Sequence, residues 1–347
     1  MEAKVIDNIR YGINPHISPE VLHFYDTNYD VLRTPDFRDE SRLLKPVHGI
    51  NIIGSATNKI CRFCGRKESE VSFDMIAHAF PECMGNHTLA TNFECDECNK
   101  FFGKAIDNDY GRFFELYHSI MHTRSKKGYT KSKFKIPCER RTDGCADYCI
   151  SLTYKENVPI VKCCKWANKY VKKGDQSLTI SKPIGKCCPI GVYKALVKMA
   201  LTVMPVEEVD VFHKTIAWLR MSEHDNFYSN GAKLLLKYQM IPGFNVTKYP
   251  HYVLFRRKRT VWDKPYMLFN LTYGCFSLTL EIPKDSKDNN TDIIANMPYP
   301  PIPFHVSSEG VWDLTGTDVP AGVGHSIVLR FEDMKAISDD SIIELTT

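Results

Sequence analysis

The chain has 347 residues, of which 43% are hydrophobic and 25% are charged, and its formal net charge is +4. These proportions exclude a low-complexity or strongly charged disordered chain and leave room for two or three domains of ~100–200 residues. No apolar run reaches the ~20 residues of a membrane helix. The first residues, Met1–Asp7, lack the apolar stretch of a secretory signal, so we expect a cytoplasmic protein that does not use a membrane.

The first half of the chain divides into a proline-punctuated segment and a cysteine-bearing segment. Four prolines interrupt residues 1–58, which predicts short helices and an accessory segment that packs or docks. In residues 59–124, apolar residues fall at helical spacing from about 96 to 122, although Gly103 and Gly111 argue against one unbroken helix.

The second half alternates strand-like and helical patterns. Two neighbouring stretches, 190–204 and 206–221, have apolar residues on one helical face and predict a central helix pair. Residues 284–304, rich in Asp, Asn and Pro, predict an exposed loop. The remaining apolar runs predict strands at 148–154, 158–161, 177–181, 252–255, 266–273, 276–282 and 326–331. The sequence therefore predicts a mixed α+β fold in which antiparallel strands surround a central helix pair.

Four of the 13 cysteines form two close pairs, Cys61-x-x-Cys64 and Cys95-x-x-Cys98. Each pair is a tight knuckle, and two knuckles at this separation can surround one tetrahedral zinc ion. Because four thiolates leave no open coordination position, we expect a structural Zn²⁺ and not a reactive one. The spacing of the other cysteines, among them Cys138, Cys145, Cys149 and the pair at 163–164, matches no familiar metal pattern and leaves a second metal open.

The residues between and after the two knuckles make the pattern more specific. In chain order, the sequence reads Cys-x-x-Cys, His78-x-x-Pro81, Gly85-Asn86, Asn92-x-x-Cys-x-x-Cys-Asn99 and Phe102-Gly103. From Ile60 to Gly103 this order resembles the HNH endonuclease family, in particular the members braced by two CxxC knuckles that occur near bacterial mobile-element and phage-defence genes.

The resemblance implies a ββα-metal fold and a role for each matching residue. His78 takes the place of the general base that activates water for phosphodiester hydrolysis. Asn92 matches the residue that fixes the loop carrying the histidine. Asn99 matches the ligand of the catalytic metal, and its amide oxygen suits Mg²⁺ or Mn²⁺.

The sequence departs from the family pattern at Ala77, where many members carry an acidic metal ligand directly before the histidine. Either another carboxylate takes its place, or the substrate phosphate and water complete the metal site, or the metal binds weakly. Asp74 would share the strand face of His78, four residues away, and Glu82 follows it closely, so both are candidates for the catalytic metal. Glu94 and Asp96 are also near in sequence.

Basic residues follow the motif and predict contact with a nucleic-acid backbone. They are Lys100, Lys104, Arg124, Lys126, Lys127 and Lys131. A second basic cluster occupies Arg256–Arg259. The alternative for both clusters is a solvated loop that keeps the protein soluble. By resemblance we expect DNA more than RNA as the substrate, and a role in defence against phage.

These observations predict three parts of the chain with different roles. Residues 1–58 form the accessory segment, and residues 59–124 form the zinc-stapled nuclease module. Residues 125–347 form an α+β domain that positions substrate, senses a trigger or binds a partner, such as a second copy or a sensor or ATPase subunit. Two other functions stay open: a zinc module that binds nucleic acid without cutting it, and a zinc-folded scaffold for protein interactions.

Overall fold

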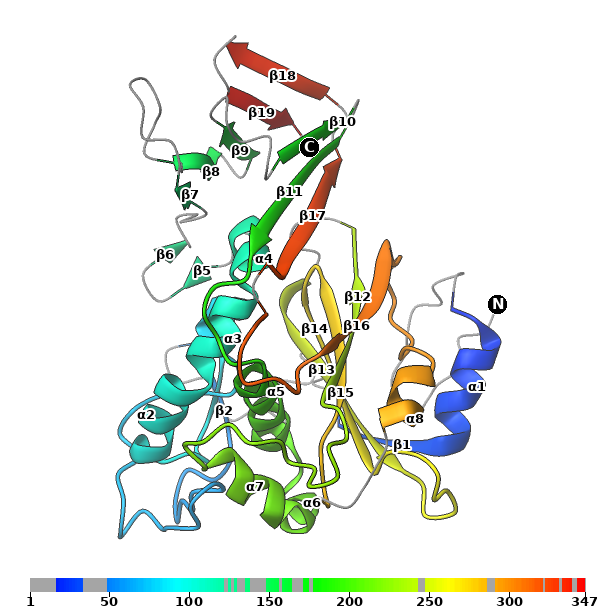
Figure 1. Ribbon diagram of the computed structural model, residues 1–347. Helices are drawn as coiled ribbons and strands as arrows, with labels where there is room; N and C mark the ends of the chain where they lie inside the picture. The colour runs from blue at the N-terminus through cyan, green and yellow to red at the C-terminus, as the bar shows by residue number, and fades with distance from the viewer. Residues whose placement is uncertain are drawn as a thin grey trace. The chain divides into compact units, whose positions relative to one another are not determined.

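The computed structural model describes the backbone of residues 17–33, 49–121, 177–242, 247–285, 291–320 and 322–330, together with short strands elsewhere (Figure 1). The chain forms two compact units. One unit comprises Met1–Tyr110 and Cys188–Thr317, and the other comprises Gly111–Cys187 and Asp318–Thr347. The bounds of these units differ from those of the three predicted parts, 1–58, 59–124 and 125–347. The roles of those parts stay predictions.

A six-stranded antiparallel sheet is the centre of the first unit. Its strand order is β1-β13-β14-β15-β12-β16. The strands are β1 (Tyr29–Arg33), β12 (Leu235–Met240), β13 (Thr247–Arg257), β14 (Met267–Gly274), β15 (Phe276–Glu281) and β16 (Ser308–Asp313). Tyr273 pairs with Phe276 across a two-residue hairpin loop, where Gly274 has a φ of 54°. Glycine accommodates this positive φ without a steric penalty.

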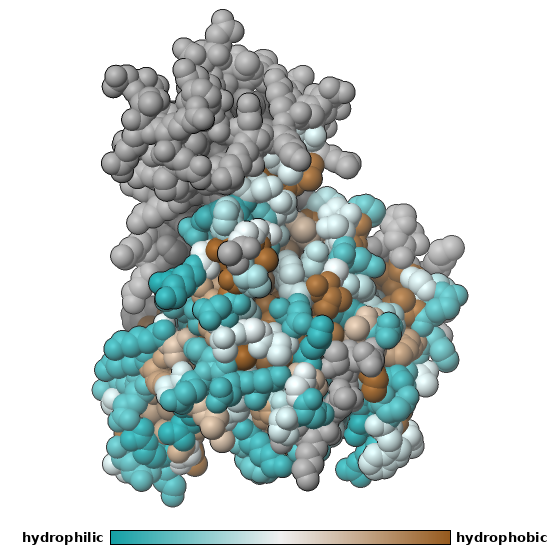
Figure 2. All heavy atoms as spheres, viewed as in Figure 1, coloured by the Kyte–Doolittle hydropathy of each residue, from teal (hydrophilic) through white to brown (hydrophobic). Residues whose placement is uncertain are grey.

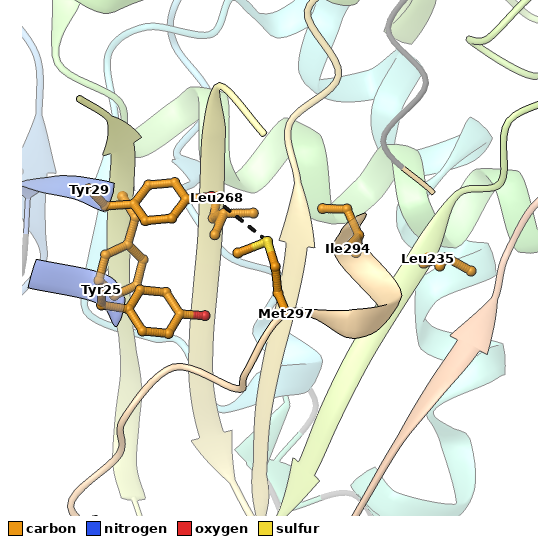
Figure 3. Packing of buried hydrophobic residues seen from close by; sticks show 7 residues of the cluster. Tyr25, Tyr29, Leu235, Leu268, Ile294 and Met297 are labelled. Atoms are coloured by element: carbon orange, nitrogen blue, oxygen red, sulfur yellow. Dashed lines mark hydrogen bonds between the residues drawn. The ribbon is translucent and has the colours of Figure 1, made fainter. Parts of the chain in front are cut away.

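Two helices cover one face of this sheet, as Figure 3 shows. They are α1 (Pro19–Asn28) and α8 (Thr291–Asn296). Their buried core with the sheet contains Tyr25, Tyr29, Leu235, Phe255, Leu268, Ile294 and Met297. The prediction of an exposed loop over 284–304 was therefore wrong in part: the apolar Ile294 and Met297 pack on the sheet and outweigh the surrounding Asp, Asn and Pro residues.

Helix α5 (Pro189–Val203) is buried along its whole length, and the hydroxyl of Tyr193 donates a hydrogen bond of 2.6 Å to the Glu281 carbonyl of β15. This helix confirms the prediction over 190–204. The second predicted helix, 206–221, is divided into α6 (Val206–Val209), a 3₁₀ turn η4 (Asp210–Phe212) and α7 (His213–Leu219). The tighter turn redirects the chain where the Phe212 ring packs 5.9 Å from that of Tyr266.

The cysteine-bearing part of this unit has a small three-stranded sheet in the order β2-β4-β3. Its elements are β2 (Asn51–Ile53), β3 (Ala77–His78), the 3₁₀ turn η2 (Glu82–Met84), β4 (Leu89–Thr91) and α2 (Asp96–Ala105). Two further helices follow in the chain: α3 (Asp107–Phe113), within which this stretch of the first unit ends at Tyr110, and α4 (Glu115–Ile120), which belongs to the second unit. The breaks fall at Ile106 and Phe114, whereas Gly103 and Gly111 lie inside helices.

The second unit is built mainly from antiparallel strands. One sheet contains β10 (Val171–Gly174), β11 (Ser177–Pro183) and β17 (Gly324–Arg330). A five-stranded sheet contains β18 (Asp333–Ser338), β19 (Ile342–Thr346), β9 (Val158–Cys163), β8 (Tyr148–Lys155) and β7 (Lys135–Pro137), and β5 (Arg124–Ser125) pairs with β6 (Gly128–Tyr129). The α+β prediction with antiparallel strands is confirmed. Among the described residues, no helix combines the length and apolarity needed to cross a membrane.

Candidate active site

The four predicted cysteines come together. The sulfur atoms of Cys61, Cys64, Cys95 and Cys98 all lie within 4.8 Å of one another, and the Cys64 and Cys95 sulfurs are 3.8 Å apart. A tetrahedral ion with Zn–S bonds of ~2.3 Å holds its sulfurs about 3.8 Å apart, so the cluster has the dimensions of a structural zinc site. Within the described part of the chain, these residues form the one group of three or more Cys, His, Asp or Glu ligands.

Local backbone geometry brings the four sulfurs together. In the first knuckle, Gly65 adopts a φ of 74° and donates a backbone hydrogen bond of 2.8 Å to the Cys61 carbonyl, which closes the turn. In the second knuckle, Cys95 is the N-cap of α2, so the first helical turn carries Cys98 back toward it. The hydrogen bond between Cys61 and Cys98 lowers the pKa of the Cys61 thiol and raises that of Cys98, so zinc binding to all four sulfurs must release a proton from this pair.

The predicted base, His78, lies at the end of β3. Ala77 pairs with Thr91 and His78 pairs with Ala90 of the antiparallel strand β4. Helix α2 begins shortly after β4, so the chain forms two strands and a helix in the order that the ββα prediction requires. The His78 side chain is 22% exposed, which leaves it accessible to solvent.

The carboxylate of Glu82 contacts the imidazole of His78. Pro81 precedes the 3₁₀ turn η2, and this turn brings Glu82 Oε1 to 3.2 Å from His78 Nε2. The Glu82 side chain is 25% exposed, so the pair forms a solvent-accessible acid–imidazole couple. Of the two carboxylates predicted to replace the missing acid at Ala77, Glu82 has this contact.

Asp74, the other predicted carboxylate, lies in a different setting. Strand β3 begins at Ala77, so the strand alternation that would place Asp74 on the face of His78 does not reach it. The Asp74 side chain is exposed and lines a surface hollow together with Lys59 and Glu68. Its backbone N–H donates to Asp96.

Asn86 is a site residue that the sequence pattern did not single out beyond its turn signal. Its side chain is only 1% exposed and spans the loop between β3 and β4. The amide nitrogen donates 2.8 Å hydrogen bonds to the carbonyls of Phe80 and Leu89, and the amide oxygen accepts from the Leu89 N–H at 3.0 Å. Asn86 therefore braces the loop that carries His78 and Glu82. The signal for this role was the position of Gly85-Asn86 directly between the histidine and the next strand.

The two asparagines predicted as site residues, Asn92 and Asn99, lie outside the loop that Asn86 braces. Asn92 donates a side-chain hydrogen bond of 2.8 Å to the Ser55 carbonyl, which ties the end of β4 to the loop after β2. Asn99 is half-buried in the first turn of α2, directly after Cys98. The zinc staple and the predicted metal ligand therefore occupy consecutive positions on one helix.

The two acidic residues beside the second knuckle, Glu94 and Asp96, make structural contacts within the first unit. Asp96 accepts hydrogen bonds from the Ser72 hydroxyl at 2.6 Å and from the Met75 N–H at 2.9 Å, which fixes the chain entering β3. Burial alone would raise the pKa of Asp96, but these hydrogen bonds outweigh burial and lower it. Glu94 is fully buried against Lys198 of α5, with 2.8 Å between Oε2 and Nζ.

Helix α5 anchors the cysteine-bearing region inside the first unit. Arg62, in the first knuckle, donates hydrogen bonds to the Thr202 carbonyl at 3.1 Å and the Met204 carbonyl at 2.9 Å, at the end of α5. Lys198 faces Glu94 and also interacts electrostatically with the half-buried Asp107. These acids raise the pKa of Lys198, although burial alone would lower it. The region is therefore not an independent appendage.

The surface of α2 carries two predicted nucleic-acid contacts. Lys100 and Lys104 are exposed and one helical turn apart, so they share a face. Figure 2 shows that hydrophilic side chains, in teal, cover this part of the molecule. Arg124 lies in β5, where only the backbone is described, and Lys126, Lys127 and Lys131 lie outside the described residues.

Residues 61–115 match the family model described as HNH endonuclease. Comparisons of the chain with curated proteins and with solved structures found no match. The matched range contains both cysteine knuckles, the β3–β4 loop and α2, so the sequence match and the geometry describe the same region. This family implies a nuclease-type function with metal binding and an interaction with nucleic acid. The segment from Cys61 to Glu115 is thus a zinc-stapled member of the HNH endonuclease family.

Proposed function

We propose that the protein is a metal-dependent endonuclease that hydrolyses phosphodiester bonds of nucleic acid. The observation that carries this proposal is the pairing of His78 with Glu82, 3.2 Å apart, inside the segment that matches the HNH family. An imidazole beside a carboxylate on an accessible loop supplies a proton acceptor and a hard oxygen ligand in one place.

Each residue of the site has a proposed role. Glu82 and the amide oxygen of Asn99 would hold Mg²⁺ or Mn²⁺, because both are hard oxygen donors. The ion, when bound, supplies positive charge on the scissile phosphate and lowers the pKa of a water. His78 accepts a proton from the attacking water. Asn86 holds the loop so that His78 and Glu82 keep their separation, and Asn92 secures the end of the neighbouring strand.

The proposed substrate is DNA in preference to RNA, and the proposed setting is defence against phage, both from the resemblance of the motif. Lys100 and Lys104 lie on the exposed face of α2 and would contact phosphates without reading sequence. We further propose that residues 125–347 position the substrate or bind a trigger or partner. A second copy would let one site per chain cut both strands.

The test is cleavage of plasmid DNA with Mg²⁺ or Mn²⁺ by the wild-type protein and by His78→Ala. We expect the variant to lose cleavage by about 10²–10⁴-fold, the usual contribution of a general base, while keeping one equivalent of zinc in the four-cysteine site. His87→Ala is the matched control, since His87 lies in the same loop and has no proposed role; its activity should stay at the wild-type level.

Ala77 supports one alternative, a zinc module that binds nucleic acid without cutting it, because the usual acidic ligand is missing there. Glu82→Gln separates the two functions. Cleavage that falls at least 10-fold, and partly returns at high Mn²⁺ concentration, supports Glu82 as the substitute ligand. Salt-sensitive DNA binding with no cleavage by the wild-type protein, under any of these metals, would support the alternative.

A further inference from the structure

The loop that joins β13 to β14 presents a tryptophan to solvent. Trp262 in this loop is 80% exposed, more than any other large hydrophobic side chain in the described part of the chain. Other tryptophans with described side chains are packed: Trp218 is 5% exposed, and Trp312 stacks on Tyr238 with 4.0 Å between ring centroids. Because tryptophan is highly buried on average, packing within the protein does not explain the position of Trp262.

The surroundings of Trp262 are positively charged. Residues 256–264 contain five Lys or Arg side chains and a single carboxylate, Asp263. Arg256 is neutralised by Glu208 and Asp30, and Lys264 is paired with Asp263. In contrast, the hydrogen bonds of Arg257 and Lys258 go to backbone carbonyls, and Arg259 is exposed. Arg257 lies 5.8 Å from the centroid of the Trp262 ring and also interacts electrostatically with Asp263, so Lys258 and Arg259 are the cations of this loop that the described residues do not pair with a carboxylate.

The loop is held in one shape by its own hydrogen bonds. Arg257 donates to the Trp262 carbonyl at 3.0 Å and to the Lys264 carbonyl at 2.6 Å. The Val261 N–H donates to the Lys258 carbonyl at 3.0 Å, and the Lys258 N–H donates to the Asn28 carbonyl at 2.9 Å, which ties the loop to the end of α1. A loop fixed in this way loses little conformational entropy when a ligand stacks on its exposed ring.

We propose that the β13–β14 loop is a binding site for single-stranded nucleic acid. Trp262 stacks on an unpaired base, while Arg257, Lys258 and Arg259 contact the flanking phosphates. An exposed aromatic ring among cations is the combination with which proteins bind single strands, because every base offers a face for stacking. A paired base within a duplex offers no free face. This inference rests on the proposed nuclease function and deepens it: the substrate carries unpaired bases as well as a scissile bond.

The experiment measures binding of labelled oligo(dT), oligo(U) and a blunt duplex to the full chain in the His78→Ala background, so that no cleavage interferes. We expect Trp262→Ala to raise the Kd for the single strands by roughly 5- to 150-fold, the effect of losing one stacked base. Trp262→Phe should retain most of the affinity. Met221→Ala, which removes another exposed apolar side chain from the same unit, should leave the Kd unchanged.

Charge variants provide a second, independent measurement. Arg259→Gln should lower the slope of log K against log salt concentration by about 0.7 for a single strand, the value for one lost phosphate contact. Lys233→Gln is the matched control, because Lys233 is an exposed cation elsewhere in the unit and already pairs with Asp313 at 3.1 Å. Its slope should match that of the parent protein.

The outcomes separate this inference from the proposed function. Equal single-strand binding by the parent and Trp262→Ala overturns the inference, whereas cleavage that still depends on His78 leaves the nuclease function in place. Loss of duplex affinity equal to the loss of single-strand affinity overturns the preference for unpaired bases. Trp262-dependent binding to phosphatidylserine vesicles, with oligonucleotide binding unchanged, overturns the inference in favour of a membrane surface. Failure of the wild-type chain to bind or cut any nucleic acid overturns both proposals.

Discussion

The zinc cluster and the His78–Glu82 pair lie in the same family segment but differ in almost every physical property. Cys61 and Cys95 are fully buried, and all four cluster ligands are sulfur atoms. The His78 and Glu82 side chains are 22% and 25% exposed, and they offer nitrogen and oxygen. A buried set of four soft ligands holds an ion for stability, whereas an accessible hard carboxylate leaves room for substrate and water. Burial and ligand type therefore distinguish the four-cysteine cluster from the pair that we propose as the reaction site.

The two sites are nevertheless joined through α2. Cys98 belongs to the cluster, and the next residue, Asn99, is the proposed ligand of the reaction metal. Asp96, in the same helical turn, fixes the chain that enters β3 and ends at His78. The four-cysteine cluster and the residues proposed to react are thus connected through one short helix and its contacts. Variants that disturb one site but not the other test this division.

The largest effect should come from Cys98→Ser. Zinc sites of this type contribute about 10–16 kcal/mol of apparent binding energy, so loss of one ligand should unfold the cysteine-bearing region. We expect bound zinc, measured by mass spectrometry of metals, to fall by one equivalent, together with loss of cooperative thermal unfolding in this region. Cys188→Ser is the control, because Cys188 lies outside the cluster. A Cys98→Ser protein that kept its zinc would contradict a closed four-cysteine site.

The next largest effect should come from Lys198→Met. This change leaves the buried Glu94 without its cation, and breaking a buried pair in this way costs about 3–5 kcal/mol. Urea unfolding of the zinc-loaded protein measures the loss, and adding Glu94→Leu should recover part of it. Glu97→Gln is the control: Glu97 pairs with Arg66 on the surface, where the side chains are 64% and 38% exposed, and its removal should not change stability measurably.

Local sequence patterns predicted the parts of the site that depend on short spacing. The two CxxC knuckles, the short strand that carries His78 and the start of the helix after Cys95 each depend on only a few residues, so their geometry is set locally. The buried Glu94–Lys198 pair joins residues more than a hundred positions apart, and no pattern around Glu94 reveals it. Likewise, Asp74 was placed by assuming a strand that begins too early, because nothing in the sequence marks Ala77 as its first residue.

The fold shows the same limit. Helix α5 was predictable because its apolar spacing is continuous. Helix α8 was not predictable, because Ile294 and Met297 are buried by packing on Leu235 and Leu268, which lie in strands that are distant in the sequence. The breaks between α2, α3 and α4 follow tertiary packing of residues such as Ile106 and Phe114, both fully buried. Nothing lies within 4 Å of where a Cβ would stand at Gly103 or Gly111, so a side chain would fit at either position and packing does not require glycine there.

Asn86→Ala should have an intermediate effect on stability. It tests the comparison at the His78–Glu82 pair, because Asn86 braces the loop that carries both residues. The change removes the side-chain donor of the buried Phe80 carbonyl and the side-chain acceptor of the Leu89 N–H, whereas the Leu89 carbonyl keeps its bond from the Ala79 N–H; each group left without a partner costs roughly 1–3 kcal/mol. We expect lower stability in urea and a large loss of cleavage, with zinc retained. Asn92→Ala is the matched control: its one strong side-chain bond, to Ser55, is exposed, so stability should fall by only about 1 kcal/mol. Equal losses for both variants would contradict the bracing role of Asn86.

The smallest effect should come from the double variant Lys100→Ala, Lys104→Ala. Both side chains are exposed on α2, so neither zinc content nor urea unfolding should change. Each lysine that contacts a phosphate of duplex DNA releases counterions on binding, and this makes affinity depend on salt. Removing both contacts should lower the slope of log K against log salt concentration by about 1.8 and weaken binding to all sequences alike.

This last variant tests whether the reaction site and the DNA-contacting surface share α2. If the slope falls as expected, phosphates lie along the exposed face of the helix that also carries Asn99 and Cys98, and the zinc cluster positions substrate as well as the reactive residues. An unchanged slope, with His78-dependent cleavage intact, would move the duplex contact away from α2. The basic residues at 124–131 would then be the next to substitute, because they follow the motif directly in the sequence.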